Sequence, residues 1–168
     1  MPEQEFSLSY RKEVRATDRE AIGEIVASSG YFSAAEREIA LELLEERLAQ
    51  GEKSGYHFLF AEQAGRVAGY TCFGPIPGSL YSYDLYWIAV QEKLRHRRIG
   101  GQLLARSEEL ISGRGGQRIY VETSSRPQYN PTLAFYRGCG YREVAFLEDF
   151  YAPGDGKIIL LKAAAPSP

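Results

Sequence analysis

The residues best suited to chemistry lie between positions 95 and 101. Four basic side chains come first, and two glycines follow one residue later. Helical spacing of apolar residues begins within this segment, so the glycines would occupy a first helical turn, where backbone N–H groups are unpaired and the helix dipole is positive. Glycine lets a phosphate approach those groups closely. The sequence therefore predicts a polyphosphate-binding site made of Arg95, His96, Arg97, Arg98, Ile99, Gly100 and Gly101.

Three other interpretations of this segment are weaker. A solvated basic loop ahead of an ordinary core helix would not need two glycines, each of which gives up about 1 kcal/mol of helix propensity relative to alanine. The glycine spacings of dinucleotide-binding and P-loop motifs, GxGxxG and GxxxxGK[ST], do not occur. A nucleic-acid-reading helix would need a broader basic surface than a chain of net charge -2 provides.

Length and composition are those of one globular domain. The chain has 168 residues, of which 44% are hydrophobic and 12% aromatic, which is enough to build a single sizeable core. We predict one domain over residues 1–168, with flexible ends at 1–6 and 163–168. Neither a signal peptide nor an apolar run of about 20 residues is visible, and the net charge disfavours nucleic acid and membranes as partners. A cytoplasmic protein is expected.

Histidine and cysteine are too few for a typical zinc site. The only candidates are His57, His96, Cys72 and Cys139, and the cysteines are far apart with no C-x-x-C pair. We therefore expect no metal and two free thiols, which suits a reducing compartment.

Strand and helix signals alternate along the rest of the chain. Capping-box spacing at Thr17–Glu20 and Ser33–Glu36 predicts two early helices, and the apolar run Ser82–Val90 predicts a central strand buried on both faces. Asn130–Pro131 predicts an N-cap and a first-turn proline. The predicted order is a strand at 8–14, helices from 17 and over 33–51, strands at 56–62, 67–73 and 82–90, a helix from 99, a strand at 118–122, a helix over 130–138, and strands at 141–147 and 157–161.

The basic segment resembles the coenzyme A signature of the GNAT acetyltransferases. That signature is R/Q-x-x-G-x-G/A, and it follows a strand that ends in an aliphatic residue, alanine and valine. Arg95 and Gly100 take its first and sixth positions. Arg98 stands where the family usually has glycine, so its side chain must point away from a pyrophosphate or clamp it from the side. The strand end corresponds to Ile88, Ala89 and Val90.

A second segment supports this resemblance. Residues 130–141 resemble the family segment N-x-x-A-x-x-F-Y-x-x-x-G-F, shortened by one residue between Asn130 and Tyr136. With the element order, the resemblance covers nearly all of residues 8–162. It implies an α/β fold, the GNAT acyl-CoA N-acyltransferase fold, with a mixed, mostly antiparallel central sheet of six to seven strands flanked by about four helices.

The resemblance also implies an activity and roles for individual residues. The chain would be an N-acetyltransferase of the EC 2.3.1 class that uses acetyl-CoA as co-substrate and moves the acetyl group directly onto a primary amine. Backbone groups of Ile88 and Val90 would pair with the pantetheine arm, an N–H near Trp87 or Ile88 would stabilise the oxyanion, and Asn130 would help to bind the cofactor. Tyr136 matches the family's general acid, although a core aromatic is the alternative.

The general base and the acceptor stay open. Asp84 lies where some family members place a catalytic glutamate, so it is a candidate for the general base. Alternatively, Asp84 only begins the strand and is solvated. The base would then be a glutamate such as Glu122, or water alone. The acceptor would be a small molecule or amino acid. An alternative acceptor is a protein or peptide N-terminus, because residues 150–157 resemble a hairpin of acetyltransferases that act on such N-termini. An alternative to the enzyme is a non-catalytic acyl-CoA-binding domain. A homodimer is a further possibility.

Overall fold

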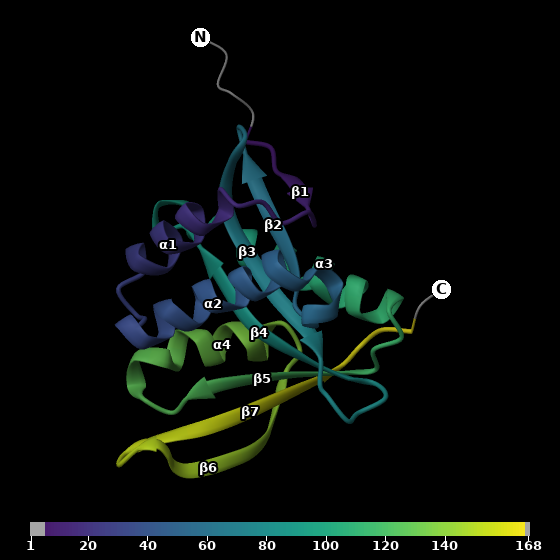
Figure 1. Cartoon of the computed structure of the whole chain (residues 1–168). Helices are drawn as coiled ribbons and strands as arrows, with labels where there is room; N and C mark the ends of the chain where they lie inside the picture. The colour runs from purple at the N-terminus through teal and green to yellow at the C-terminus, as the bar shows by residue number, and fades with distance from the viewer. Residues whose placement is uncertain (1–5, 167–168) are drawn as a thin grey trace. The chain divides into compact units, whose positions relative to one another are not determined.

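The computed structural model describes residues 6–166, and its elements follow the predicted order (Figure 1). Seven strands and four α-helices occur in this range, joined at three places by short 3₁₀ turns. The elements are β1 (Ser9–Arg11), α1 (Asp18–Ser28), α2 (Ala34–Gln50), β2 (His57–Gln63), β3 (Arg66–Pro75), β4 (Ser82–Val90), α3 (Ile99–Gly113), β5 (Arg118–Ser124), α4 (Asn130–Gly138), β6 (Arg142–Ala152) and β7 (Asp155–Ala163).

The strands form a mixed sheet, as the resemblance implied. Hydrogen bonding links them in the order β1-β2-β3-β4-β5-β7-β6. The pairs β1–β2, β2–β3, β5–β7 and β6–β7 are antiparallel, and β4–β5 is parallel. The chain divides into two compact units. The first contains the residues before Gly74 together with Trp87–Ser107, and the second contains Gly74–Tyr86 together with the residues from Glu108 onward.

In the first unit, α1 and α2 contribute buried apolar side chains, among them Ile22 and Leu44. The capping box at Ser33–Glu36 is present as predicted. The one predicted at Thr17 is wrong, because the Thr17 side chain makes no capping bond. The neighbouring Asp18 is buried and accepts hydrogen bonds from the Arg15 N–H and the Arg11 guanidinium instead.

A glycine allows close packing against α3 in this unit. A Cβ atom at Gly69 of β3 would lie 2.8 Å from the Ala89 carbonyl oxygen and 3.1 Å from a methyl group of Leu103. Beside it, the hydroxyls of Thr71 and Ser107 form a buried hydrogen bond of 2.7 Å. A larger residue at position 69 would displace the backbone of β4 or the helix.

Strand β4 has the predicted bounds but not the predicted burial. Tyr83, Leu85 and Ala89 are buried, whereas the residues between them are only half-buried. The prediction of burial on both faces is therefore wrong. Aromatic residues such as Tyr86 made the strand look uniformly apolar, although one face also carries Ser82 and Asp84.

In the second unit, β5 and β7 bury Ile119, Val121 and Leu160. Strands β6 and β7 are longer than predicted and run side by side as an antiparallel hairpin (Figure 1). Their register shifts between the pairs Leu147–Lys157 and Ala152–Asp155, so residues 148–151 of β6 form a bulge opposite one residue of β7. Every residue of β6 is exposed.

Three further features differ from or extend the sequence analysis. A 3₁₀ turn, Pro127–Tyr129, precedes α4, and Asn130 already has helical angles, so the predicted N-cap at Asn130 is wrong by one residue. Ala163 ends β7, and the Ala164 N–H donates to Gln117 O at 3.0 Å. Of the ends predicted to be flexible, residues 1–5 and 167–168 lie outside the described residues.

Cys72 and Cys139 are both free, as expected. No helix among residues 6–166 is both long enough and apolar enough to cross a bilayer.

Candidate functional site

The loop between β4 and α3 has a glycine-like backbone at the position where the coenzyme A signature usually has glycine. His96 has φ 68° and Arg98 has φ 59°, both in the left-handed region. That conformation costs a non-glycine residue roughly 1–2 kcal/mol. The Gln102 N–H donates to Arg98 O at 3.2 Å, which is the first bond of the helix ladder. The N–H groups at the start of α3 therefore have no acceptor within the helix.

The start of this loop is fixed to β3. The Gln91 N–H donates to Ala68 O, and the Gln91 side-chain amide donates to Val67 O, each at 2.8 Å. A 3₁₀ turn follows, in which the Arg95 N–H donates to Glu92 O at 3.1 Å. The loop is thus held by main-chain hydrogen bonds before the left-handed residues are reached.

The basic side chains of the loop have different surroundings. Arg95 is half-buried, with its guanidinium 5.2 Å from the centre of the Tyr31 ring. Arg97 is exposed and stacks at 4.6 Å over Phe6. His96 and Arg98 are exposed. Because the Arg98 side chain is exposed, it can turn away from a ligand. It therefore does not block the backbone N–H groups of the loop.

At the end of β4, Ala89 is buried while Ile88 and Val90 are half-buried. Gly100 is half-buried in the first turn of α3. The structure thus brings the predicted cofactor-binding residues 88–90 and 95–101 together in one unit.

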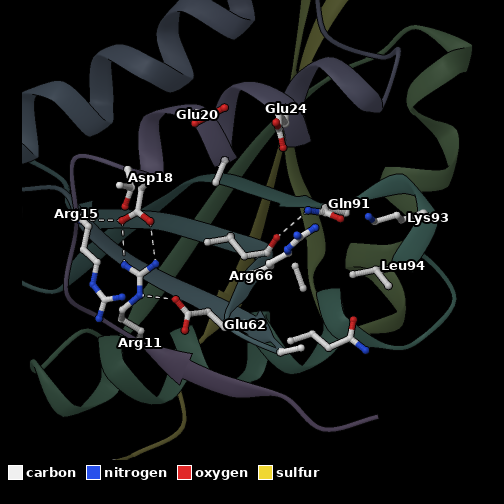
Figure 2. A pocket seen from close by; sticks show the side chains of 17 residues that line it. Arg11, Arg15, Asp18, Glu20, Glu24, Glu62, Arg66, Gln91, Lys93 and Leu94 are labelled. Carbon is white, nitrogen blue, oxygen red and sulfur yellow. Dashed lines mark hydrogen bonds and ion pairs between the residues drawn. The ribbon is translucent and has the colours of Figure 1, made fainter. Parts of the chain in front are cut away.

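A separate pocket of about 700 Å³ lies in the same unit (Figure 2). Its floor is an ion-pair network in which the Arg11 guanidinium donates to Asp18 at 2.8 and 2.9 Å and to Glu62 at 2.7 Å. Burial lowers the pKa of Arg11, but the two carboxylates raise it above its ordinary value overall. The pocket contains Lys93 but none of residues 95–101. Its ion pairs tie β1, α1 and β2 together.

Asp84 lies in the second unit, in a cluster of charges on the sheet. It pairs in register with Tyr120 of β5, and Glu122 lies two residues farther along that strand. The Lys157 Nζ of β7 is 2.8 Å from Glu122 Oε2. Burial and the Glu122 charge raise the pKa of Asp84, the Lys157 charge lowers it, and the result is about 6. Such a carboxyl group is ionised at neutral pH and still basic enough to accept a proton.

Tyr136 lies on α4 in the same unit and is 4% exposed. Its ring makes edge contacts with Phe135 at 5.3 Å and Tyr141 at 5.5 Å between centroids. Burial and the neighbouring Cys139 raise the pKa of the Tyr136 phenol, so it holds its proton at neutral pH, as a general acid must. Core packing alone would give the same burial.

Two other predicted features of α4 can be located. Asn130 is exposed at the start of the helix. Burial and the Glu108 carboxylate raise the pKa of the Cys139 thiol. A protonated thiol is a weak nucleophile.

The sequence analysis missed Lys157. This lysine belongs to the Asp84 cluster only because β5 and β7 pair with Ser124 opposite Lys157. That register joins residues more than 30 positions apart, and no local motif marks it. The hairpin glycines near Lys157 were visible, but they do not indicate which face of the sheet its side chain occupies.

Comparison with known proteins decides the family. Residues 20–141 match the model of the acetyltransferase (GNAT) family. The chain belongs to this family. Membership makes it an N-acetyltransferase, the enzyme class that the sequence predicted, and the α/β fold with a mixed, mostly antiparallel sheet is the GNAT fold.

Individual relatives agree with this assignment. A crystal structure of a GNAT-family acetyltransferase from Desulfovibrio desulfuricans is 38% identical, with a TM-score of 0.92 over 95% of this chain and 100% of its own. The N-acetyltransferase YuaI of Bacillus subtilis is 30% identical over 90 residues, which are 52% of this chain. The chain spans 50% of the length of that curated relative.

A more distant structure shares the fold and was solved with a ligand. It is the PaiA N-acetyltransferase of Thermoplasma acidophilum in complex with coenzyme A. That protein is 19% identical, with a TM-score of 0.71 over 94% of this chain and 99% of its own.

Proposed function

We propose that this acetyltransferase binds acetyl-CoA at the β4–α3 loop and transfers its acetyl group directly to a primary amine of a small molecule or amino acid. The observation that carries the proposal is the left-handed backbone at Arg98 followed by N–H groups without helical acceptors. Such an arrangement suits a pyrophosphate whatever side chain stands at that position.

The donors of this loop fit the cofactor. The N–H groups of His96 to Gly101 would receive the pyrophosphate, and Arg95 adds positive charge that the chain as a whole lacks. Backbone groups of Ile88 and Val90 would pair with the pantetheine arm, and Asn130 would contact the cofactor from the side. Acetyl-CoA supplies the activated thioester, and the chain supplies binding, orientation and proton transfer.

Proton transfer to and from the reacting groups falls to two side chains. A lysine-like ammonium has a pKa of about 10.4 and an α-amine one of about 8, so the acceptor must lose a proton before it attacks. Asp84, ionised above pH about 6, would accept that proton through water. Tyr136, protonated at neutral pH, would donate a proton to the departing sulfur. An N–H near Trp87 or Ile88 would stabilise the oxyanion.

One observation favours a peptide acceptor as the second candidate. Phe146, Phe150 and Tyr151 of β6 are each about half exposed, and apolar side chains gathered on one exposed strand suit contact with another polypeptide. A homodimer stays a prediction as well.

A thiol-release assay on a panel of amines tests the proposal. The panel should compare small amines and amino acids with short peptides that have free N-termini, at pH 8. We expect turnover on at least one amine, and a peptide preference would select the second candidate. Acetyl-CoA binding without turnover on any amine would contradict the proposal and indicate a non-catalytic acyl-CoA-binding domain.

A further inference from the structure

We propose that Lys157 is a positioning residue that keeps Asp84 ionised beside Glu122 and thereby sets the acid limit of the acetyl transfer. The inference rests on the proposed role of Asp84 as the base. It concerns side chains of the second unit only.

The register of three strands places these groups on one face of the sheet. Asp84 of β4 is opposite Tyr120 of β5, and Glu122 follows on the same face because side chains alternate along a strand. Lys157 of β7 is opposite Ser124, two residues beyond Glu122. Asp84, Glu122 and Lys157 therefore follow one another on one face across β4, β5 and β7, and Lys157 contacts Glu122 directly.

Contacts from two sides hold the Lys157 side chain in place. It is 12% exposed, and its Nζ lies 2.8 Å from Glu122 Oε2. The bulge of β6 brings an aromatic pair against the same ammonium: Nζ is 3.8 Å from the Phe150 ring centroid and 5.7 Å from that of Tyr151. A lysine on an open strand would lose side-chain entropy to stay in one rotamer; here an ion pair and a cation–π contact fix it.

Burial and the charges on this face together determine how Asp84 ionises. Burial and Glu122 favour the protonated carboxyl group, and Lys157 opposes them. Without Lys157, two neighbouring carboxylates would compete, and one would keep its proton to a higher pH. With Lys157 present, the pKa of Asp84 is about 6, so Asp84 is ionised at neutral pH and can attract a cationic amine.

Strands β4 to β7 also contribute other titratable groups around this face. Tyr86 of β4 and Tyr120 of β5 contribute phenol groups to it. Asp155 of β7 accepts a hydrogen bond from Ser124 and pairs with Arg126 at 3.2 Å, so its charge is offset. In the bulge of β6, Asp149 accepts the Gly154 N–H at 2.7 Å, and Glu148 is exposed.

The test uses two substitutions with opposite expected effects on Asp84. Lys157→Met removes the cation, so the acid limb of kcat/KM should move to higher pH by roughly one unit. Glu122→Gln removes the competing carboxylate, so the limb should move to lower pH. Lys157→Arg keeps a cation and should keep the limb near its wild-type position. A merely structural lysine would not give shifts of opposite sign.

Lys162→Met is the matched control. Lys162 lies on the same strand and forms a comparable ion pair with Glu108, 2.7 Å from Nζ to Oε2, but it is five residues away and therefore on the other face. Its loss should leave the acid limb of kcat/KM unmoved. Thermal melting of each variant checks that the fold is kept.

Carboxyl ¹³C NMR titration of Asp84 gives a readout that needs no turnover. Its midpoint should rise in Lys157→Met and fall in Glu122→Gln, and an unchanged midpoint in Lys157→Met would overturn the inference. If the midpoint moves while the acid limb does not, Asp84 is not the base and the proposed function fails in that step alone. Loss of all activity in Glu122→Gln would assign the base to Glu122 and overturn the role given to Asp84.

Discussion

The β4–α3 loop and the Asp84 cluster are built in different ways. The loop is local, because residues 95–101 are consecutive. Its suitability for a phosphate depends on the backbone conformation, which is left-handed at Arg98 although arginine replaces the usual glycine. The cluster is assembled from β4, β5, β6 and β7. Its electrostatic properties depend on side-chain charges that the strand register brings together. A backbone site tolerates a change of side chain, whereas a side-chain cluster depends on each member. Substitutions should therefore act differently in the two regions.

The largest effect is expected in the second unit, at Tyr136. Tyr136→Phe removes the phenol that would protonate the leaving thiolate, so kcat should fall by about 10²–10⁴-fold. The KM for acetyl-CoA should change little, and stability should be kept because the ring still fills its site between Phe135 and Tyr141. Steady-state kinetics with a melting curve measure both. If the phenylalanine variant keeps the wild-type kcat, Tyr136 is not the general acid and serves only in core packing.

At Asp84, the expected effect is on both activity and its pH dependence. Wild-type kcat/KM should rise with pH through about 6, because the ionised form of Asp84 is the active one. Asp84→Asn should lower kcat/KM by about 10²-fold and remove that acid limb. A pH–rate profile of both proteins measures this. An unchanged acid limb in the asparagine variant would assign it to another group.

Asp84→Asn should also change stability, in the opposite direction to activity: activity should fall and stability should rise. The pKa of Asp84 is raised on folding, so the folded protein binds its proton more tightly and loses stability as pH rises from about 4 to about 6. Asparagine avoids this cost. Allowing for the half-exposed side chain, Asp84→Asn should raise the free energy of unfolding at pH 7 by about 1 kcal/mol. Urea unfolding measures it, and equal stability at pH 4 is the control.

A gain in stability is also expected in the loop. Arg98→Gly relieves the left-handed strain and should raise the free energy of unfolding by about 1 kcal/mol, with acetyl-CoA affinity retained. The matched change, Arg97→Gly, offers no such relief because only its neighbours have positive φ, so it should destabilise. Urea unfolding of the pair tests this. Lower stability for Arg98→Gly would mean that the arginine side chain, rather than the backbone, organises the loop.

The smallest effect is expected at the aromatic support of Lys157. Phe150→Leu keeps the charges of the cluster but removes a cation–π contact of about 0.5–1 kcal/mol. The acid limb of kcat/KM should move by only a few tenths of a pH unit, in the same direction as for Lys157→Met. A closely spaced pH–rate profile can resolve that shift. A larger movement would show that the ring, and not the charge, controls Asp84.

Local signals account for what the sequence predicted well. The bounds of Ser82–Val90, the capping box at Ser33 and the element order all depend on residues close together in the chain. The errors came from tertiary partners. Asp18 makes its bonds to Arg11 and Arg15, leaving Thr17 without a capping role. The half-buried face of β4 and the position of Lys157 in the Asp84 cluster depend on which strands pair. That pairing could not be predicted from local sequence patterns.

The most direct test of the central claim is acetyl-CoA binding measured by calorimetry in the wild type and in Gly100→Glu. Glutamate in the first turn is favourable for the helix, so the variant should fold, but its bulk and charge should exclude a pyrophosphate. Gly113→Glu, at the other end of α3, is the control. The account predicts binding in the wild type and in the control, and none in Gly100→Glu. Undiminished binding in Gly100→Glu, or no binding by folded wild type, would contradict it.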